Sequence, residues 1–332
     1  MNSLPIEAKL DVLKFLDFNQ LYSFKQTNFY FLNLINKYKE ELALIKFNTF
    51  SITDEDRELT SFKIIEIESG IFDIFLNEHI LKKWQAALDK SIPLFLHDFE
   101  SNKKFIVCLQ KTLYRVDDIN PHYRLLNLPN FPKNIEEMIV IRCWLEQLFN
   151  CSFTYAYFSL VVFNPEMIDL LFDNDKTIAT QFHIRRPYLT AGNNIFESVF
   201  KLVLNHFSVF LSPTITFKDD ISEQHIDILL NIIVNEGKKL SKIYLGCSKF
   251  ITLHDLIVKY VATSADCSKM VAFIVLDYFS FPNFKLDARA ENVEITKIND
   301  LETTSYQIAN IYNPGVKFLI QNSDTLTFIE RM

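Results

Sequence analysis

The residues that come closest to a metal or catalytic pattern are Asp173-Asn174-Asp175. Two carboxylates one residue apart could hold a divalent cation beside a nucleotide phosphate, since hard cations prefer oxygen ligands. The triplet follows directly after an apolar helical stretch, however, where a polar turn is expected. We therefore interpret Asp173-Asn174-Asp175 as a solvated turn.

The histidines form no recognisable acid–base pair in the sequence. His254-Asp255 and Glu78-His79 are neighbours along the chain. Side chains that are adjacent on a helix do not face each other. The pattern therefore predicts structural or solvent-facing roles for all seven histidines.

The cysteines are scattered and contain no C-x-x-C pair, at Cys108, Cys143, Cys151, Cys247 and Cys267. An odd number without tight spacing is typical of buried, reduced thiols in a cytosolic or nuclear protein. There is no G-x-S-x-G nucleophile elbow, and only 5 glycines argue against a loop that cradles phosphate. The sequence predicts a protein that is not an enzyme and has no metal or cofactor.

An enzyme stays open as an alternative under one condition. It would require a deep pocket that gathers two or more candidate side chains, namely Asp173, His183, His206, His225 and Cys247. Sequence alone does not say which of them meet in space.

One compact basic and aromatic cluster is present, Arg185-Arg186-Pro187-Tyr188. A formal net charge of −7 gives no basic field for nucleic acid. If the strand predicted over 177–184 is right, the cluster lies just past its carboxyl end, where α/β proteins commonly bind ligands. Exposed Arg and Tyr suit a protein-binding hot spot. We predict Arg185, Arg186 and Tyr188 as substrate-binding residues, and two ordinary loop charges are the alternative.

Aromatic residues are abundant, with 32 Phe and 13 Tyr. Tyr155, Tyr157 and Phe163 alternate along a predicted strand, and we interpret them as sheet core. If part of the aromatic excess lies instead on a concave face, it would form the apolar patch that a protein partner needs.

These candidates depend on a regular alternation of helices and strands from Asn134 onward. The predicted helices cover 135–148, 164–172, 194–206, 222–236 and 253–262, and the predicted strands cover 153–163, 177–184, 214–217, 242–245 and 270–276. The units recur about every 25 to 33 residues, which is the period of solenoid arrays. Before them we predict strands over 62–67, 94–97 and 104–109, a helix over 70–89, and a proline-rich loop over 117–134.

Helices and strands in alternation imply right-handed crossovers and a mainly parallel sheet in an α/β fold. A curved, leucine-rich-repeat-like array and a closed, doubly wound domain both fit. The variable unit length favours an irregular curved array. The last stretch contains predicted strands over 292–298 and 316–320 and a weak helix over 301–310, which could cap the open end of the sheet.

Three short helices are predicted in the first 48 residues. Pro5 suits a first helical turn, and Leu10, Leu13 and Leu16 follow at helical spacing. Asn19 and Asn28 can cap the second and third helices, the third with an apolar stripe that reaches Ile45. The polar stretch over 49–60 predicts a linker. Three helices of this size bury too little surface to form a stable domain alone.

This stretch resembles an F-box, the motif that docks Skp-type adaptors in Skp–cullin–F-box ubiquitin ligases. The resemblance begins with Leu4-Pro5-x-Glu7 and departs from the family at Thr27-Asn28, and at Phe31, where Trp is usual. The amino-acid sequence of this stretch is similar to those of F-box proteins of nematodes. The resemblance implies adaptor-binding roles for the apolar positions Leu4, Pro5, Val12, Leu13, Leu16, Leu21, Phe24 and Phe31.

We therefore predict an F-box-like module over 1–48 and an α/β repeat-like substrate-binding domain over 61–332. The function predicted is that of a substrate receptor, which binds a Skp-type adaptor, through it a cullin, and a target protein. The alternative is a non-catalytic interaction scaffold whose N-terminal helices only cap the array. No signal peptide or spanning segment is predicted, and no nucleic acid or membrane partner is expected.

Overall fold

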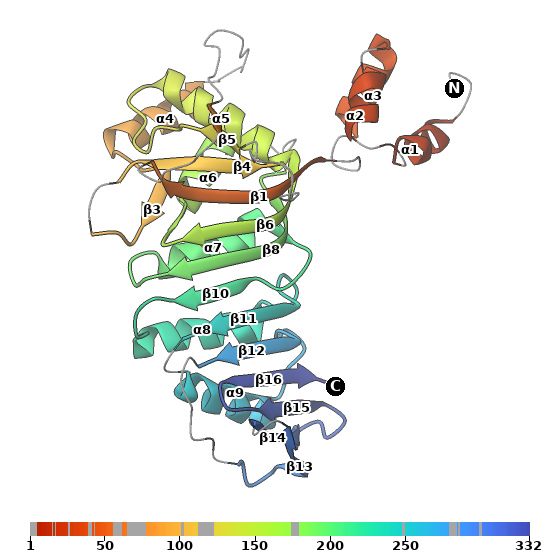
Figure 1. Cartoon of the computed structure of the whole chain (residues 1–332), viewed down its shortest axis with the longest axis vertical. Helices are drawn as coiled ribbons and strands as arrows, with labels where there is room; N and C mark the ends of the chain where they lie inside the picture. The colour runs from red at the N-terminus through yellow and green to blue at the C-terminus, as the bar shows by residue number, and fades with distance from the viewer. Residues whose placement is uncertain are drawn as a thin grey trace.

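The protein is a mixed α/β structure in which one long sheet carries helices along one side (Figure 1). The computed structural model describes residues 5–14, 16, 18–25, 27–38, 42, 44–55, 62–64, 78–100, 103–111, 123–173, 179–247, 250–278, 284, 286–298 and 301–332. A small group of helices at the N-terminus lies beside one end of the sheet (Figure 1).

The centre of the sheet is parallel, and its strands lie side by side in chain order. They are β1 (Ile45–Asp54), β6 (Cys151–Ser159), β8 (Phe182–Ala191), β10 (Thr214–Phe217), β11 (Lys242–Gly246) and β12 (Phe273–Asp277). The short strand β9 (Phe207–Val209) pairs with the start of β8. Residues at one level of the sheet, Tyr157, Tyr188, Thr214, Tyr244 and Val275, recur at intervals within the predicted repeat length.

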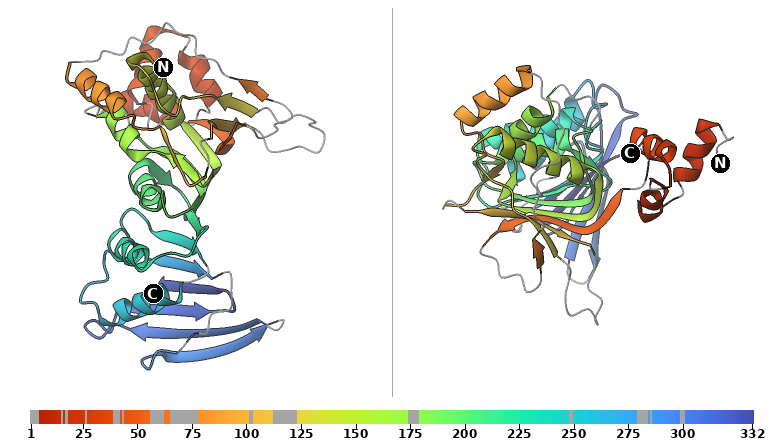
Figure 2. Two further views of the ribbon diagram at one scale, coloured as in Figure 1. Left: turned by 90° about the vertical axis from the view of Figure 1, so that its left-hand side faces the viewer. Right: turned by 90° about the horizontal axis from the view of Figure 1, so that it is seen from above.

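A helix precedes each parallel strand after the first. These are α5 (Ile135–Phe149), α6 (Pro165–Phe172), α7 (Phe196–His206), α8 (Glu223–Asn235) and α9 (Ile251–Thr263). They lie along the same side of the sheet and leave the other side bare, which we call the helix-free face (Figure 2). The predicted bounds of these helices are confirmed to within a few residues, because apolar spacing and caps such as Asn134 and Ser222 mark them.

Both ends of the sheet are antiparallel, so the prediction of a mainly parallel sheet holds only for the centre. Beyond β1 lie β4 (Phe105–Gln110), β5 (Tyr123–Leu126) and β2 (Phe62–Ile64), and beyond β12 lie β16 (Leu326–Arg331), β15 (Lys317–Asn322), β14 (Leu301–Ala309) and β13 (Glu291–Ile298). Within these antiparallel ends, β2 and β5 alone pair in parallel. A separate antiparallel pair joins β3 (Phe95–His97) to β7 (Val161–Phe163), and α4 (Glu78–Asp89) precedes β3.

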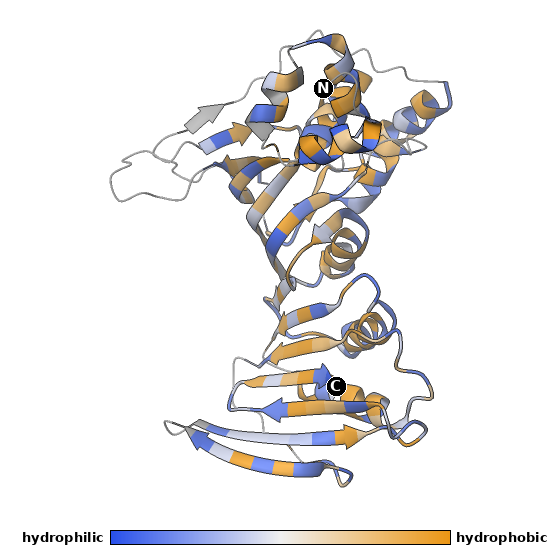
Figure 3. Ribbon diagram, turned by 90° about the vertical axis from the view of Figure 1, so that its right-hand side faces the viewer, coloured by the Kyte–Doolittle hydropathy of each residue, from blue (hydrophilic) through white to orange (hydrophobic). Residues whose placement is uncertain are grey.

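The helix predicted over 301–310 is wrong, because these residues form β14. Tyr306 and Ile308 are buried, and the intervening Ser305, Gln307 and Ala309 are only partly covered. This period of two is the pattern of a strand with one face in the core. Figure 3 displays an alternation of polar and apolar residues along the outermost strand, β13.

The linker predicted over 49–60 is also wrong in its first part. The third helix ends at Lys37 rather than reaching Ile45, and Ile45–Asp54 forms β1 inside the sheet. Phe47, Phe50 and Ile52 are buried, and the Phe50 ring stacks on Phe153 with centroids 4.5 Å apart. Polar residues between them hid the strand. The α/β part therefore begins at Ile45, ahead of the predicted boundary.

The N-terminal module comprises α1 (Ile6–Lys14), α2 (Phe18–Lys25) and α3 (Phe29–Lys37). Its buried residues form a cluster of their own, distinct from the core of the sheet. The predicted cap at Asn28 is confirmed, since its Oδ1 accepts the Phe31 N–H at 3.0 Å.

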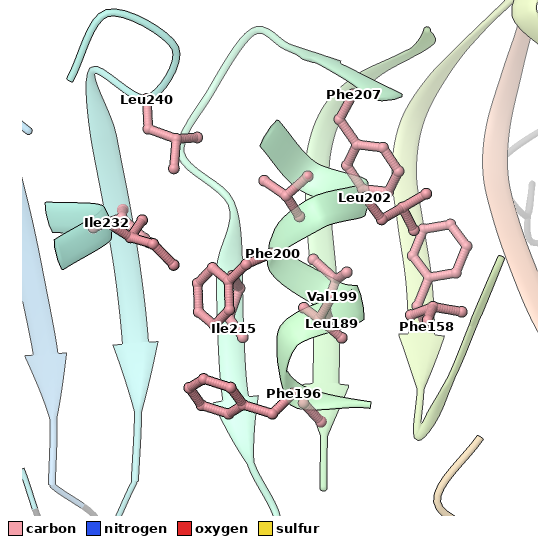
Figure 4. Close-up of a cluster of buried hydrophobic side chains, with 14 of the residues drawn as sticks. Phe158, Leu189, Phe196, Val199, Phe200, Leu202, Phe207, Ile215, Ile232 and Leu240 are labelled. Atoms are coloured by element: carbon pink, nitrogen blue, oxygen red, sulfur yellow. The ribbon is translucent and has the colours of Figure 1, made fainter. Parts of the chain in front are cut away.

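The main core fills the space between sheet and helices. Figure 4 shows Phe158, Leu189 and Ile215 from successive strands facing Val199 and Phe200 of α7. All five are at most 2% exposed. Close packing of one helix over three strands fixes where each strand lies, and therefore where the side chains on the helix-free face lie.

Candidate functional site

The carboxylate triplet does not gather a metal site among the described residues. Asp173 forms an ion pair with Lys83 of α4, and Asn174 and Asp175 lie outside the described residues. No group of three or more His, Cys, Asp or Glu side chains that could hold a metal ion is found in the part of the chain that is described. The position of Asp173 at the end of α6 fits the predicted turn.

His206 and His254 are buried beside carboxylates. Asp169 Oδ1 lies 3.3 Å from His206 Nε2, and Asp255 Oδ1 lies 3.0 Å from His254 Nδ1. The prediction that neighbouring side chains would not meet is therefore wrong for His254 and Asp255. Burial lowers the pKa of both imidazoles, and the acidic neighbours oppose that shift only in part. Both side chains therefore belong to the core in their neutral form.

The five cysteines are all free and buried, as predicted. Burial raises the pKa of the Cys143 thiol to about 11 and that of the Cys151 thiol to about 12. A thiol with so high a pKa is protonated near neutral pH and is a poor nucleophile.

The Arg185-Arg186-Tyr188 cluster lies inside a strand, not beyond its end. The predicted strand stopped at residue 184 because two arginines and a proline resemble a loop, whereas β8 runs from Phe182 to Ala191. Its side chains are exposed at Arg185, Arg186 and Tyr188 and buried at Pro187 and Leu189. The cluster therefore lies on the helix-free face of the sheet.

Two tyrosines on the adjacent strand β6 join this cluster. Tyr155 pairs with Arg186 across the strands, and Tyr157 pairs with Tyr188. The Tyr157 and Tyr188 rings stack at 5.3 Å and 12°, the Tyr155 and Tyr157 rings at 6.3 Å and 15°. Arg186 Cζ lies 5.9 Å from the Tyr155 ring centroid. We call Tyr155, Tyr157, Arg186 and Tyr188 the tyrosine strip.

The interpretation of Tyr155 and Tyr157 as sheet core is wrong, while that of Phe163 is confirmed. Tyr157 is 43% exposed and Tyr155 is half-buried, whereas Phe163 is fully buried. Partial burial raises the pKa of Tyr157, and the neighbouring Tyr188 and Tyr155 add to the shift. Strict alternation of apolar and polar residues would have shown which face of β6 is buried. Phe153 and Phe158 are an odd number of residues apart, so both faces of the strand looked apolar in the sequence.

Polar groups continue the same face toward the C-terminus. The Thr190 and Thr216 hydroxyl oxygens lie 3.1 Å apart, and Tyr244 OH donates to Asp277 Oδ2 at 2.5 Å. Burial, followed by this bond, raises the pKa of Tyr244. Aromatic rings, hydroxyls and a guanidinium together make a surface that can bind a polypeptide through stacking and hydrogen bonds.

A pocket of about 760 Å³ adjoins the tyrosine strip at the starts of β1, β6, β8 and β9. We call it the strand-start pocket. Of the residues required for the enzyme alternative, it contains His183 and none of the other four.

The predicted adaptor-binding residues divide into two groups in the N-terminal module. Leu13, Leu21 and Phe31 are at most 5% exposed, and Leu16 and Phe24 pack against them. Pro5 and Val12 are exposed, and Leu4 lies outside the described residues.

Sequence reasoning missed three exposed apolar residues in the module, Ile6, Phe29 and Tyr30. Their exposed fractions are 38%, 75% and 46%. Tyr30 accepts a hydrogen bond from Lys9 Nζ at 2.9 Å. Lys9 is one helical turn from both Ile6 and Val12. Ile6, Val12 and Tyr30 therefore surround Lys9 on one surface, and the two aromatic residues after the Asn28 cap were the signal for it.

Residues 65–218 match a family model described as a domain of unknown function (DUF8381). The match covers less than half of the 332 residues; it includes the tyrosine strip and excludes the N-terminal module. No curated protein and no solved structure matches the chain.

None of the helices within the described residues is long and apolar enough to cross a membrane.

Proposed function

We propose that the chain is a substrate receptor of a cullin-type ubiquitin ligase, in which the N-terminal module docks a Skp-type adaptor. The observation that carries this proposal is a three-helix unit with its own apolar cluster and exposed apolar residues beside it. A unit this small gains stability by burying that surface against a partner. The resemblance of Leu4-Pro5-x-Glu7 and the following helices to an F-box supports the same partner.

The burial pattern gives the adaptor-binding residues different roles in this proposal. Leu13, Leu21 and Phe31 hold the three helices together and act on binding through the shape of the module. Pro5, Val12 and the added residues Ile6 and Tyr30 are exposed and would touch the adaptor directly. Exposed apolar side chains that become buried on binding contribute most of the affinity of such interfaces.

A pull-down with recombinant Skp-type adaptor tests the proposal. Ile6→Asp and Val12→Asp place a charge on the exposed surface and should weaken binding by about tenfold or more. Phe131→Asp is the matched control, because Phe131 is also an exposed apolar residue (53%) but lies in the α/β part. Adaptor binding that is absent from the wild-type chain, or equal in all variants, would refute the docking role.

We further propose that the α/β part is an irregular, curved, leucine-rich-repeat-like array that presents the target. Strands in chain order with helices along one side support an array, because a doubly wound sheet reverses its strand order and has helices on both faces. The tyrosine strip is the target-binding surface in this proposal. The receptor then acts by proximity, raising the effective concentration of target lysines without bond chemistry of its own.

The alternative is a non-catalytic interaction scaffold whose N-terminal helices only cap the array. The separate clusters of the module and the sheet favour a docking module over a cap, since a cap shares its core with the unit it covers. In the scaffold alternative the tyrosine strip still binds a protein, but no adaptor is recruited. A cytoplasmic or nuclear location remains part of the proposal.

A further inference from the structure

The strand-start pocket opens on the helix-free face, next to the tyrosine strip. Lys46, Ser152 and His183 line it, together with Phe47, Phe153 and Ile184, with which they alternate and whose side chains are largely buried in the core. Because successive strand residues point to opposite faces, the polar residues project away from the helices. Thr154 and Arg185 also line the pocket, and each immediately precedes a residue of the strip.

The polar lining of the pocket is positively charged. It comprises Lys46, Ser152, Thr154, His183, Arg185 and Ser208, and it includes no carboxylate. The chain as a whole has a formal net charge of −7, so this pocket runs against the average charge of the molecule. Hydroxyls and cations around one hollow donate hydrogen bonds to an anionic group.

The lysine and arginine side chains of the pocket are available to a ligand. Lys46 and Arg185 are exposed, and neither belongs to an ion pair within the described residues. They come from β1 and β8, which flank β6 on either side. An anionic group over β6 would therefore meet a cation on each side.

The rim of the pocket adds an exposed apolar side chain on a hydrogen-bonded backbone. Phe210 is 79% exposed, and its N–H donates to the Ile184 carbonyl at 3.1 Å. The next N–H, of Leu211, donates to the Arg185 carbonyl at 3.0 Å. These bonds tie the backbone of the rim to β8, so little backbone conformational entropy is lost when Phe210 packs against a ligand.

We propose that the strand-start pocket binds an acidic peptide segment of the target protein, through aspartate or glutamate side chains followed by an apolar residue on Phe210. This inference rests on the proposed role of the helix-free face as the target-binding surface. An extended segment rises about 3.3 Å per residue, so a few further residues reach the tyrosine strip. Arg185 and Lys46 supply the charge complementarity that selects such a segment.

Fluorescence anisotropy with the full chain tests this inference without the adaptor, so it does not depend on the docking role. The probe is a labelled peptide in which glutamates alternate with leucines, and the reference probe has glutamine at each glutamate position. We expect the glutamate peptide to bind about tenfold or more tightly than the glutamine peptide at low salt, and this preference to shrink as salt screens the charges.

Variants locate the binding on the chain. Lys46→Glu and Arg185→Glu should each reduce affinity for the glutamate peptide by about tenfold, and Arg185→Lys should retain most of it. Lys259→Glu, an exposed charge reversal on α9, is the matched control and should leave the affinity unchanged.

Three outcomes would overturn the inference. They are equal binding of the two peptides, an equal loss with Lys259→Glu, and binding only of a third peptide in which phosphoserine replaces one glutamine of the glutamine peptide. The last outcome would assign the pocket to phosphate rather than to carboxylates. Loss of adaptor binding with intact peptide selectivity would refute only the docking module.

Discussion

Gly237 lies just past α8, where its backbone meets the segment that precedes β12. Its N–H donates to the Lys269 carbonyl at 2.8 Å, and a Cβ at this position would come within 2.2 Å of the Met270 carbonyl oxygen. A glycine just past the last turn suits a helix C-terminus, and here the absence of a Cβ also allows two backbones to approach closely. The first role can be inferred from the sequence, whereas only the tertiary structure reveals the second.

Replacing Gly237 with alanine should lower the free energy of unfolding by about 1–3 kcal/mol, because the added methyl group forces backbone apart in a packed region. Urea unfolding followed by circular dichroism measures the change. Gly315→Ala is the matched control, since its Cβ would only reach Asn313 Oδ1 at 3.4 Å. Equal stability of the two variants would contradict the close-approach argument.

Asp98, in the loop after β3, organises the turn that leads into α7. Its carboxylate accepts the N–H groups of Gly192, Asn194 and Ile195 at 2.9, 3.0 and 3.2 Å. The cap residue of α7, Ile195, makes no side-chain cap bond of its own. The acceptor thus comes from a residue almost a hundred positions away, which no local pattern could predict.

Asp98→Ala should destabilise the protein by about 1–3 kcal/mol, since three N–H groups lose their acceptor. Asp98→Asn keeps one oxygen acceptor and should be affected less. Thermal melting of the two variants beside the wild type measures this order. If the Asp98→Ala and Asp98→Asn variants are equally stable, the carboxylate does not stabilise the turn.

At the scale of elements, the sequence predicted the helices better than the strands. Helices α5 to α9 carry long apolar stripes and recognisable caps, so their spacing identified them. The strands β1 and β14 were missed because Phe47, Phe50, Tyr306 and Ile308 are buried by partners far along the chain. In β1 the buried residues Phe47, Phe50 and Ile52 do not follow one unbroken period of two, so the local pattern did not identify a strand.

The position of β1 sharpens the test of the N-terminal module. A chain that begins at Ile45 keeps the whole of β1 and should melt within a few degrees of the full protein, because the module has its own apolar cluster. A chain that begins at Glu55 loses Phe47, Phe50 and Ile52 from the core and should fail to fold cooperatively.

Differential scanning calorimetry distinguishes these outcomes. Two separate unfolding transitions of the full chain would support a separable docking module, if one of them persists in the chain that begins at Ile45. Unfolding of both truncated chains would instead favour the scaffold alternative, in which the first helices only cap the array.

At the scale of the whole molecule, buried histidines couple stability to pH. Burial lowers the folded-state pKa of His206 and His254 below the unfolded value of about 6.5. Below that value the unfolded chain binds more protons than the folded one, so stability falls as pH falls. Above it, the contribution of the neutral imidazoles is fully present.

The melting temperature should therefore decrease as the pH is lowered from about 7 to about 5. His254→Asn should make this decrease shallower, because the variant lacks one group that must be protonated in the unfolded chain. His79→Asn is the matched control, since His79 is exposed on α4. Identical pH slopes for the wild type and His254→Asn would exclude His254 as a source of the dependence.

The sequence by itself determined the alternation of helices and strands, the repeat length and the three N-terminal helices. These properties follow from apolar spacing and capping residues within about one repeat of the chain. The tertiary structure decided which face of each strand meets the helices. That choice moved Tyr155 and Tyr157 out of the core and set them beside Arg186 and Tyr188. It also placed Lys46 and Arg185, which are far apart in sequence, in one pocket. Parallel pairing brings together residues far apart in sequence, and no local pattern encodes that proximity.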